Sequence, residues 1–98
     1  MSIQSKMQDG VLTISVTGRF TFQLFREFSD AYQNIGDKPT LVDVDLGAVD
    51  YVDSAALGML LSMSGHFEDG TDIRLSKPNS TVRKILEIAR FDKTFDIV

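Results

Sequence analysis

The sequence contains no cysteine and no tryptophan, and its single histidine is His66. Without cysteine there is no disulfide framework and no thiolate metal site, which fits a reducing compartment. No EF-hand or two-carboxylate-plus-histidine pattern is present, so we expect neither a metal nor a cofactor. No apolar run approaches the roughly 18 residues of a membrane span, and "MSIQSKMQDG" has no apolar signal core. We therefore expect a cytoplasmic protein without membrane insertion.

Positive charge is also scarce. Ten Lys and Arg residues are scattered among 14 Asp and Glu residues, giving a net charge of −4. Proteins that bind nucleic acid need clustered basic side chains to neutralise phosphates, so we expect no nucleic-acid partner. The composition that remains, 43% hydrophobic and 24% charged, is typical of a globular chain. A length of 98 residues predicts a single domain over 1–98.

The first third of the chain contains two different hydrophobic periods. Residues 2–7 and 11–17 alternate on either side of an Asp-Gly pair, which predicts a β-hairpin. Residues 22–35 change to helical spacing and predict an amphipathic helix, with Thr21 as its N-cap and Gly36 as a left-handed residue after its end. The inward positions predicted for this helix are Phe25, Phe28, Tyr32 and Ile35.

Strands and helices alternate through the rest of the chain. The expected segments are a strand at 40–46, a helix at 54–67, a turn at 68–72, a strand at 73–75 and a helix capped by Asn79 or Ser80. A tail containing Phe91, Phe95 and Ile97 is expected to pack on the core. The order ββαβαβα, plus a short terminal turn or helix, predicts an α/β domain. Its mixed, mainly parallel sheet should have about four strands.

Ser54 follows Asp53 at the predicted junction between a strand and a helix. Either residue is a good N-cap, so a capping role explains the pair without any further function. We do not expect a hydrolase nucleophile, because the G-x-S-x-G elbow is missing and a serine needs a base. His66 lies near the far end of the same helix, about 18 Å away at 1.5 Å per residue.

The helix that follows Ser54 is apolar on nearly all sides. We expect the stripe formed by Leu57, Leu60, Leu61 and Ser64 to pack on the sheet. The surplus apolar residues on other faces are Ala55, Ala56, Met59 and Met63. Such a surplus indicates either a helix sandwiched in the core, where methionine is ordinary filler, or a helix that contacts a partner.

Taken together, these segments resemble the STAS domain, the fold of bacterial anti-sigma factor antagonists, over nearly the whole chain. "TGRFT" lies where that family has a Thr-Gly-Glu-Leu-Asp type segment, and "SKPNSTVRKILEIARFDKTFDIV" is similar to its closing helix and Phe-x-Ile tail. "LVDVDLGAVDYVDSAALGML" is similar to the central motif, Asp-Leu, a spacer, and Asp-Ser-Ser/Thr-Gly-Leu-Gly. The resemblance implies that Ser54 is phosphorylated by a serine kinase related to histidine-kinase ATPases. It also implies that a PP2C-like phosphatase removes the phosphate.

Three positions depart from the family pattern. Ala55 replaces a serine or threonine and so removes a neighbouring acceptor, Ala56 replaces a glycine, and Thr21 replaces an aspartate. The residues expected to contact a partner are Asp53, Ala55, Ala56, Met59, Met63, Phe20, Thr21 and Tyr51.

The resulting hypothesis is a non-enzymatic phosphoswitch in a partner-switching pathway that regulates transcription. The unmodified form binds its kinase, an anti-sigma-type partner or a downstream regulator, and a phosphate on Ser54 releases that partner. Two alternatives stay open: a constitutive STAS adaptor, such as a subunit of a transporter complex, in which Ser54 is only a cap, and a small-molecule or nucleotide sensor.

Overall fold

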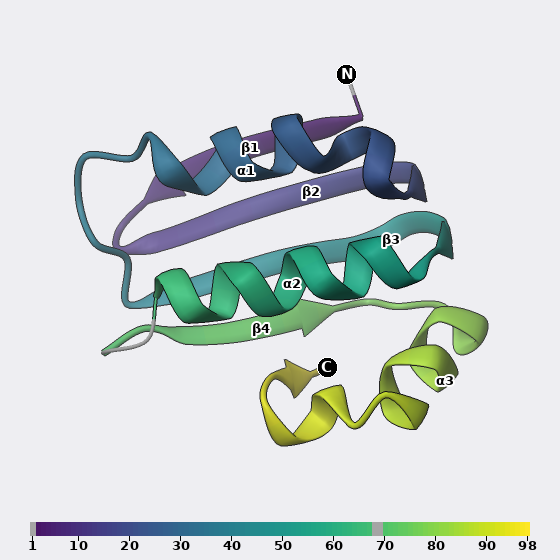
Figure 1. The fold of residues 1–98 in the computed structure, drawn as a ribbon. Helices are drawn as coiled ribbons and strands as arrows, with labels where there is room; N and C mark the ends of the chain where they lie inside the picture. Colours follow the sequence, from purple (N-terminus) through teal and green to yellow (C-terminus); the bar gives the residue numbers. More distant parts are fainter. Residues whose placement is uncertain (1, 68–69) are drawn as a thin grey trace.

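The computed structural model describes residues 2–67 and 70–98, which form one five-stranded sheet with strand order β1-β2-β3-β4-β5 (Figure 1). β1 is antiparallel to β2, and every later neighbouring pair is parallel. The elements in chain order are β1 (Ile3–Gln8), β2 (Val11–Phe20), the 3₁₀-helix η1 (Phe22–Leu24), α1 (Phe25–Gln33), β3 (Leu41–Val52), α2 (Ser54–His66), β4 (Asp72–Ser76), α3 (Ser80–Ile88), the 3₁₀-helix η2 (Phe91–Lys93) and β5 (Asp96–Ile97). The predicted mixed, mainly parallel α/β domain is confirmed, with β5 as an added strand.

The hairpin forms at the Asp-Gly pair, as predicted. Asp9 and Gly10 have φ angles of 53° and 81°, the left-handed region that a two-residue hairpin turn requires. Gln8 therefore pairs directly with Val11. The same turn is tied to the start of the next strand, because the carbonyl of Gly10 accepts a hydrogen bond of 2.8 Å from the amide of Thr40.

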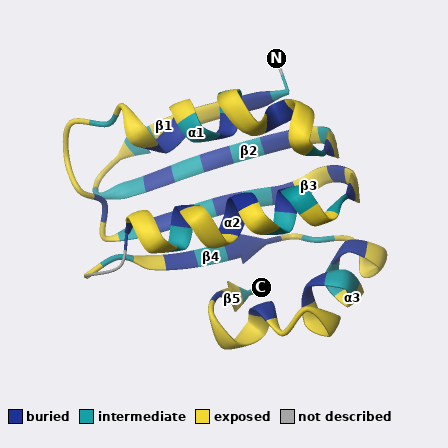
Figure 2. Cartoon of the chain, viewed as in Figure 1, coloured by how far each residue is buried: buried dark blue, intermediate teal, exposed yellow. Residues whose placement is uncertain are grey.

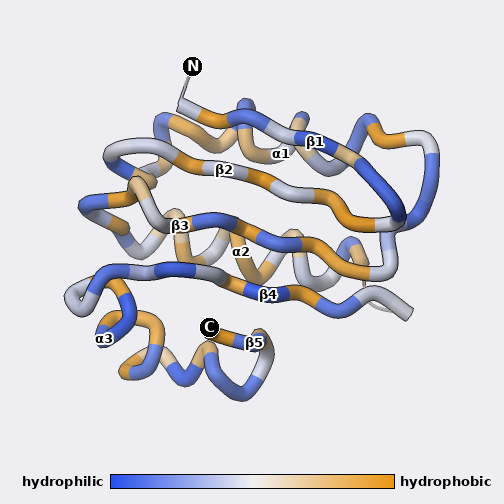
Figure 3. Tube along the Cα trace, turned by 180° about the vertical axis from the view of Figure 1, so that it is seen from behind, coloured by the Kyte–Doolittle hydropathy of each residue, from blue (hydrophilic) through white to orange (hydrophobic). Residues whose placement is uncertain are grey.

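Helices α1 and α2 cover one face of the sheet, and the view from behind shows β1 to β4 without a described helix over them (Figures 1 and 3). The covered face carries the alternate apolar residues of the two longest strands. They are Leu12, Ile14, Val16, Val42, Val44 and Leu46, all buried. Figure 2 shows the matching buried side of α2 turned toward the sheet. Most of the core thus lies between the sheet and these two helices, and buried residues of α3 and the C-terminal tail extend it.

The first helical segment differs from its prediction at both ends. It opens as the 3₁₀-helix η1, Thr21 makes no side-chain capping bond, and α1 ends at Gln33, so Gly36 takes no left-handed conformation. A 3₁₀ turn has fewer residues per turn than an α-helix, which shifts the phase of the residues that follow. Leu24 therefore takes an inward position, while Phe25, predicted to be buried, is exposed.

The C-terminal segments close the edge of the sheet beyond β4. Asn79 caps α3 by accepting a 2.8 Å hydrogen bond from the amide of Val82, as one of the two predicted caps. Phe91 and Phe95 are buried with ring centroids 5.3 Å apart, which confirms the predicted packing of the tail. The turn predicted at 68–72 includes residues 68 and 69, which lie outside the described residues.

Candidate functional site

Ser54 is the first residue of α2 and is exposed. The cap of this helix is the preceding residue, because Oδ1 of Asp53 accepts a 2.8 Å hydrogen bond from the amide of Ala56. The structure thus decides between the two predicted caps in favour of Asp53. Formation of the helix therefore does not depend on the hydroxyl of Ser54.

The second oxygen of Asp53 links two neighbouring connections. Oδ2 accepts a 3.3 Å hydrogen bond from the amide of Phe22, at the start of η1. The amide of Asp53 in turn donates to the carbonyl of Phe20, also at 3.3 Å. The chain leaving β2 and the chain leaving β3 therefore lie side by side at one end of the sheet (Figure 1). The two hydrogen bonds thus hold Asp53, directly before Ser54, against the chain that leaves β2.

A hollow of about 280 Å³ lies at this end of the sheet, lined by Arg19, Thr21, Phe22, Gln23 and Asp53. Arg19 pairs with Tyr51 across β2 and β3, and its guanidinium carbon lies 4.3 Å from the centroid of the Tyr51 ring. A cationic group is therefore present among the residues that line the hollow, beside the aspartate that precedes Ser54.

Three aromatic side chains at this end are accessible to solvent. Phe22 is 66% exposed, Phe25 51% and Tyr51 43%, and the rings of Phe22 and Phe25 stack with centroids 5.9 Å apart. The sequence predicts Tyr51 as a partner contact but neither phenylalanine, because helical spacing places Phe25 among the inward positions and gives no face for Phe22. Exposed apolar groups gathered beside a polar site are a common feature of protein interaction surfaces.

The expected exposure of Met59 and Met63 is wrong. Both are buried, together with Ala56 and Leu60, whereas Leu61, which we expected to pack on the sheet, is 48% exposed. Spacings of three and four residues from Ala56 place these side chains on one face. Because α2 is apolar nearly all round, its hydrophobic pattern did not specify which face turns inward.

The predicted partner-binding set is therefore divided. Phe20 is also buried, with its ring centroid 5.2 Å from that of Phe28. The structure leaves four of the predicted contact residues at least partly accessible, namely Asp53, Ala55, Thr21 and Tyr51. The accessible surface at this end of the molecule thus consists of the strand-to-helix connections and the first turn of α2.

His66 lies at the opposite end of α2 from Ser54. It is exposed, and its ring lies 5.1 Å from Tyr32 and 4.8 Å from Phe67 between centroids. This separation gives Ser54 no histidine base, in agreement with the sequence argument. Within residues 2–67 and 70–98 no cluster of three or more potential metal-ligating side chains is found, and no helix there is long and apolar enough to cross a membrane.

Asp43 lies on the uncovered face and joins β3 to β4. Its carboxylate accepts a 2.9 Å bond from Arg74 and a 2.7 Å bond from the hydroxyl of Ser76. The hydrogen bond with Asp43, followed by the negative charge of that carboxylate, raises the pKa of the Arg74 guanidinium above its ordinary value. Asp43 and Arg74 are register partners in neighbouring strands. This acidic residue thus links the sheet and lies apart from Ser54.

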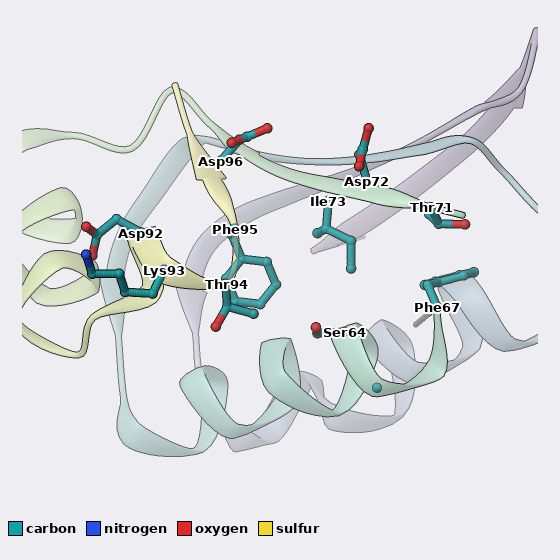
Figure 4. Close-up of a pocket in the computed structure, with 11 residues that line it drawn as sticks. Ser64, Phe67, Thr71, Asp72, Ile73, Asp92, Lys93, Thr94, Phe95 and Asp96 are labelled. Atoms are coloured by element: carbon teal, nitrogen blue, oxygen red, sulfur yellow. The ribbon is translucent and has the colours of Figure 1, made fainter. Parts of the chain in front are cut away.

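A larger hollow, of about 480 Å³, lies beside the C-terminal half of α2. Figure 4 shows Ile73, Phe95 and Ser64 facing one another across it, whereas the carboxylates of Asp72 and Asp96 lie on the other side of the strands. Its acidic residues are therefore not gathered around a common point. The hollow is remote along α2 from Ser54 and shares no lining residue with the smaller one.

Comparison with known proteins places the whole fold in one family. A family described as "Mlab, STAS domain" matches residues 3–98. A STAS-domain containing protein of Pseudomonas aeruginosa (strain UCBPP-PA14) is 41% identical over 87 residues, which cover 88% of this chain and 86% of that protein.

Two solved structures share the fold. A putative anti-sigma factor antagonist from Thermotoga maritima has a TM-score of 0.81 at 22% identity, covering 97% of this chain and 84% of that one. A sulfate transporter family protein from Wolinella succinogenes has a TM-score of 0.79 at 19% identity, covering 90% of this chain and 73% of that one. At these identities the similarity concerns the fold alone. The same fold thus occurs in a protein described as an anti-sigma factor antagonist and in one described as a sulfate transporter family protein.

Proposed function

This chain belongs to the STAS domain family, and on that premise we propose that it is a non-enzymatic regulatory phosphoprotein with Ser54 as its acceptor. The unmodified domain binds a partner, and a phosphate on Ser54 releases it. The observation that carries this proposal is that two different residues provide the cap and the exposed hydroxyl at the start of α2. Asp53 caps the helix, while Ser54 is exposed and its hydroxyl is not part of the capping bond.

A phosphate at this position is compatible with the fold. It adds a charge of about −1.5 to −2 near a helix N-terminus, where the helix dipole stabilises an anion by about 0.3–1 kcal/mol. Asp53 and the exposed Asp50 oppose it through like charge. Because these effects act in opposite directions and at the surface, we expect the folded structure to change little.

A phosphate on Ser54 should affect the affinity for a partner more strongly than it affects the fold. Burying a phosphate against an apolar or acidic partner surface costs several kcal/mol of desolvation, and each 1.4 kcal/mol weakens binding about tenfold. The exposed rings of Phe22, Phe25 and Tyr51 are the apolar groups available for such an interface. We propose that they contact the partner, in place of the buried Met59 and Met63. The proposed partners are a serine kinase of the histidine-kinase-like ATPase type and a PP2C-like phosphatase.

The direct test is mass spectrometry of the protein isolated from its own cells. We predict a species heavier by one phosphate group, with tandem fragmentation placing that group on Ser54. The control is Ser54→Ala, which should remain unmodified under the same growth conditions. A phosphate found instead on Thr21, Ser62 or Ser64 would contradict this assignment.

The release step is tested by charge substitution with a matched control from the same chain. Ser80 is the exposed first residue of α3, directly after the cap Asn79, so it occupies the same helical position as Ser54. We predict that Ser54→Asp weakens binding to proteins captured by wild type, while Ser54→Ala and Ser80→Asp retain it. Circular dichroism should show the same fold for all three. Full retention of binding by Ser54→Asp would argue against electrostatic release.

A second candidate function, a constitutive adaptor, is favoured by the sulfate transporter family protein that shares the fold. In this case Ser54 serves only as a helix residue, and partner binding is insensitive to its charge. Absence of a phosphorylated species under every growth condition, together with equal binding by Ser54→Ala and Ser54→Asp, would support the adaptor and reject the phosphoswitch.

A further inference from the structure

Arg19 is an exposed cation held by a contact that is easily exchanged. It lies near the end of β2, and its guanidinium carbon is 4.3 Å from the centroid of the Tyr51 ring. The ring itself is partly open to solvent. A cation–π contact at an exposed site is weak compared with a charge-assisted pair between arginine and phosphate. A phosphate placed within reach would therefore compete successfully for the guanidinium.

The backbone around Arg19 is fixed beside the residue that precedes Ser54. The carbonyl of Phe20 accepts a hydrogen bond from the amide of Asp53, and the amide of Phe22 donates one to the carboxylate of Asp53. The residues that follow Arg19 are therefore bonded to Asp53. Arg19 and Asp53 also line the same hollow of about 280 Å³. Ser54 does not line this hollow itself, but it is exposed and directly follows Asp53, so a group attached to its hydroxyl begins one residue from the lining.

The local charges leave this arginine as the group suited to a phosphate. Asp50 and Asp53 repel a phosphate, whereas Arg19 is the basic residue among those lining the hollow. The planar guanidinium presents paired donors that match two phosphate oxygens. We propose that Arg19 receives the phosphate of phosphorylated Ser54, giving up its contact with Tyr51 and exposing that ring. This inference rests on the proposed phosphorylation of Ser54.

The exchange changes two features of the surface at once. It partly neutralises the new phosphate, and it uncovers the flat side of an aromatic ring at the proposed partner interface. Arg19 acts here as a positioning residue, since it orients the modified side chain toward the hollow. Phosphorylation then alters the surface by rearranging a side chain as well as by adding charge, without any change in the backbone.

The test uses protein in which phosphoserine is genetically encoded at position 54, so that no cellular kinase is needed. Phosphorus NMR gives the midpoint of the second phosphate ionisation, ordinarily near pH 6. A nearby cation favours the dianion and lowers this midpoint. We predict a midpoint about one pH unit lower in the otherwise wild-type chain than in Arg19→Gln, with Arg19→Lys recovering part of the difference. Equal midpoints in the wild-type background and Arg19→Gln would overturn the proposal.

The matched control is Lys38→Gln, which removes the same unit of charge from an exposed residue before β3, at the far end of that strand from Ser54. It should leave the midpoint unchanged. A shift as large as that of Arg19→Gln would mean that net charge, and not contact, sets the midpoint, and the proposal would fail.

The exchange itself is followed through the side-chain protons of Arg19. In the unphosphorylated protein the Tyr51 ring should shield them, and Tyr51→Leu should abolish this shielding. Phosphoserine at position 54 should remove it as well, while Ser80→Asp should leave it in place. Persistent shielding in the phosphorylated protein would overturn the exchange. Neither NMR experiment depends on phosphorylation in cells, so failure of the cellular test and failure of this inference are distinguishable.

Discussion

Asp53 makes more of the bonds at the proposed switch than any other side chain described there. It caps α2 through Ala56 and holds the start of η1 through Phe22. We predict that Asp53→Ala lowers the free energy of unfolding by about 0.5–2 kcal/mol, the usual cost of a lost N-cap. Urea denaturation followed by circular dichroism measures it. Asp50→Ala, an exposed neighbour on β3, is the control and should change stability by less than about 0.5 kcal/mol. Equal costs would show that capping is not what Asp53 contributes.

Single residues were predictable from the sequence only where local chemistry decides. The Asp-Gly turn and the cap of α3 depend on neighbouring residues; the turn was predicted correctly, and Asn79 is one of the two predicted caps. The contact of Arg19 with Tyr51 was not, because it depends on register shifts between β2 and β3, one of them between Gly18 and Arg19. No local pattern specifies such a shift. The role of Ser54 as an acceptor stays a prediction.

At the scale of the element, α2 offers a direct comparison between buried and exposed apolar residues. Met63 is 0% exposed and Leu61 is 48% exposed, although they lie two positions apart. Met63→Ala should cost about 2–5 kcal/mol, because it leaves a cavity in a packed core. Leu61→Ala should change stability by no more than about 0.5 kcal/mol. Urea denaturation of both variants tests this, and a larger loss for Leu61→Ala would restore the helix face expected from the sequence.

The same helix shows why its boundaries were easier to predict than its buried face. The Asp-Ser pair in "VDSAAL" predicts where it starts, although only the structure selects Asp53 as its cap. Which face of α2 turns inward depends on the position at which the chain leaves β3. That strand continues to Val52, beyond the expected end at residue 46. Because α2 is apolar nearly all round, it has no polar face that would indicate which side is exposed to solvent. For α1 the 3₁₀ turn had a comparable effect, turning Phe25 outward.

At the scale of the whole molecule, the topology followed from alternation of strand and helix patterns, since parallel strands need crossover helices. The sequence did not reveal β5, because two residues are too few to form a periodic pattern. This strand still matters for the sheet. The amide of Val98 donates to the carbonyl of Leu75, and the amide of Lys77 donates to the carbonyl of Val98. The tail is thereby attached to β4 by backbone bonds as well as by its buried rings.

A single hydrophobic cluster extends from Ile3 in β1 to Phe95 in the tail. If it is one cooperative unit, damage at one end must lower the stability of the other. Phe95→Ala should cost about 3–5 kcal/mol. The chain has two tyrosines and no tryptophan, so a Tyr51→Phe background leaves Tyr32, packed between α1 and α2, as the only fluorescent reporter.

In that background we predict that Phe95→Ala lowers the urea midpoint of Tyr32 fluorescence and of circular dichroism by the same amount. The milder Phe95→Leu should move both midpoints together by less, which keeps the comparison measurable should the alanine variant be too unstable. A circular dichroism transition that moves while the Tyr32 midpoint stays fixed would show that the tail unfolds separately. Residues 1–98 would then not act as a single cooperative domain, because the core beneath α1 and α2 would be stable without Phe95.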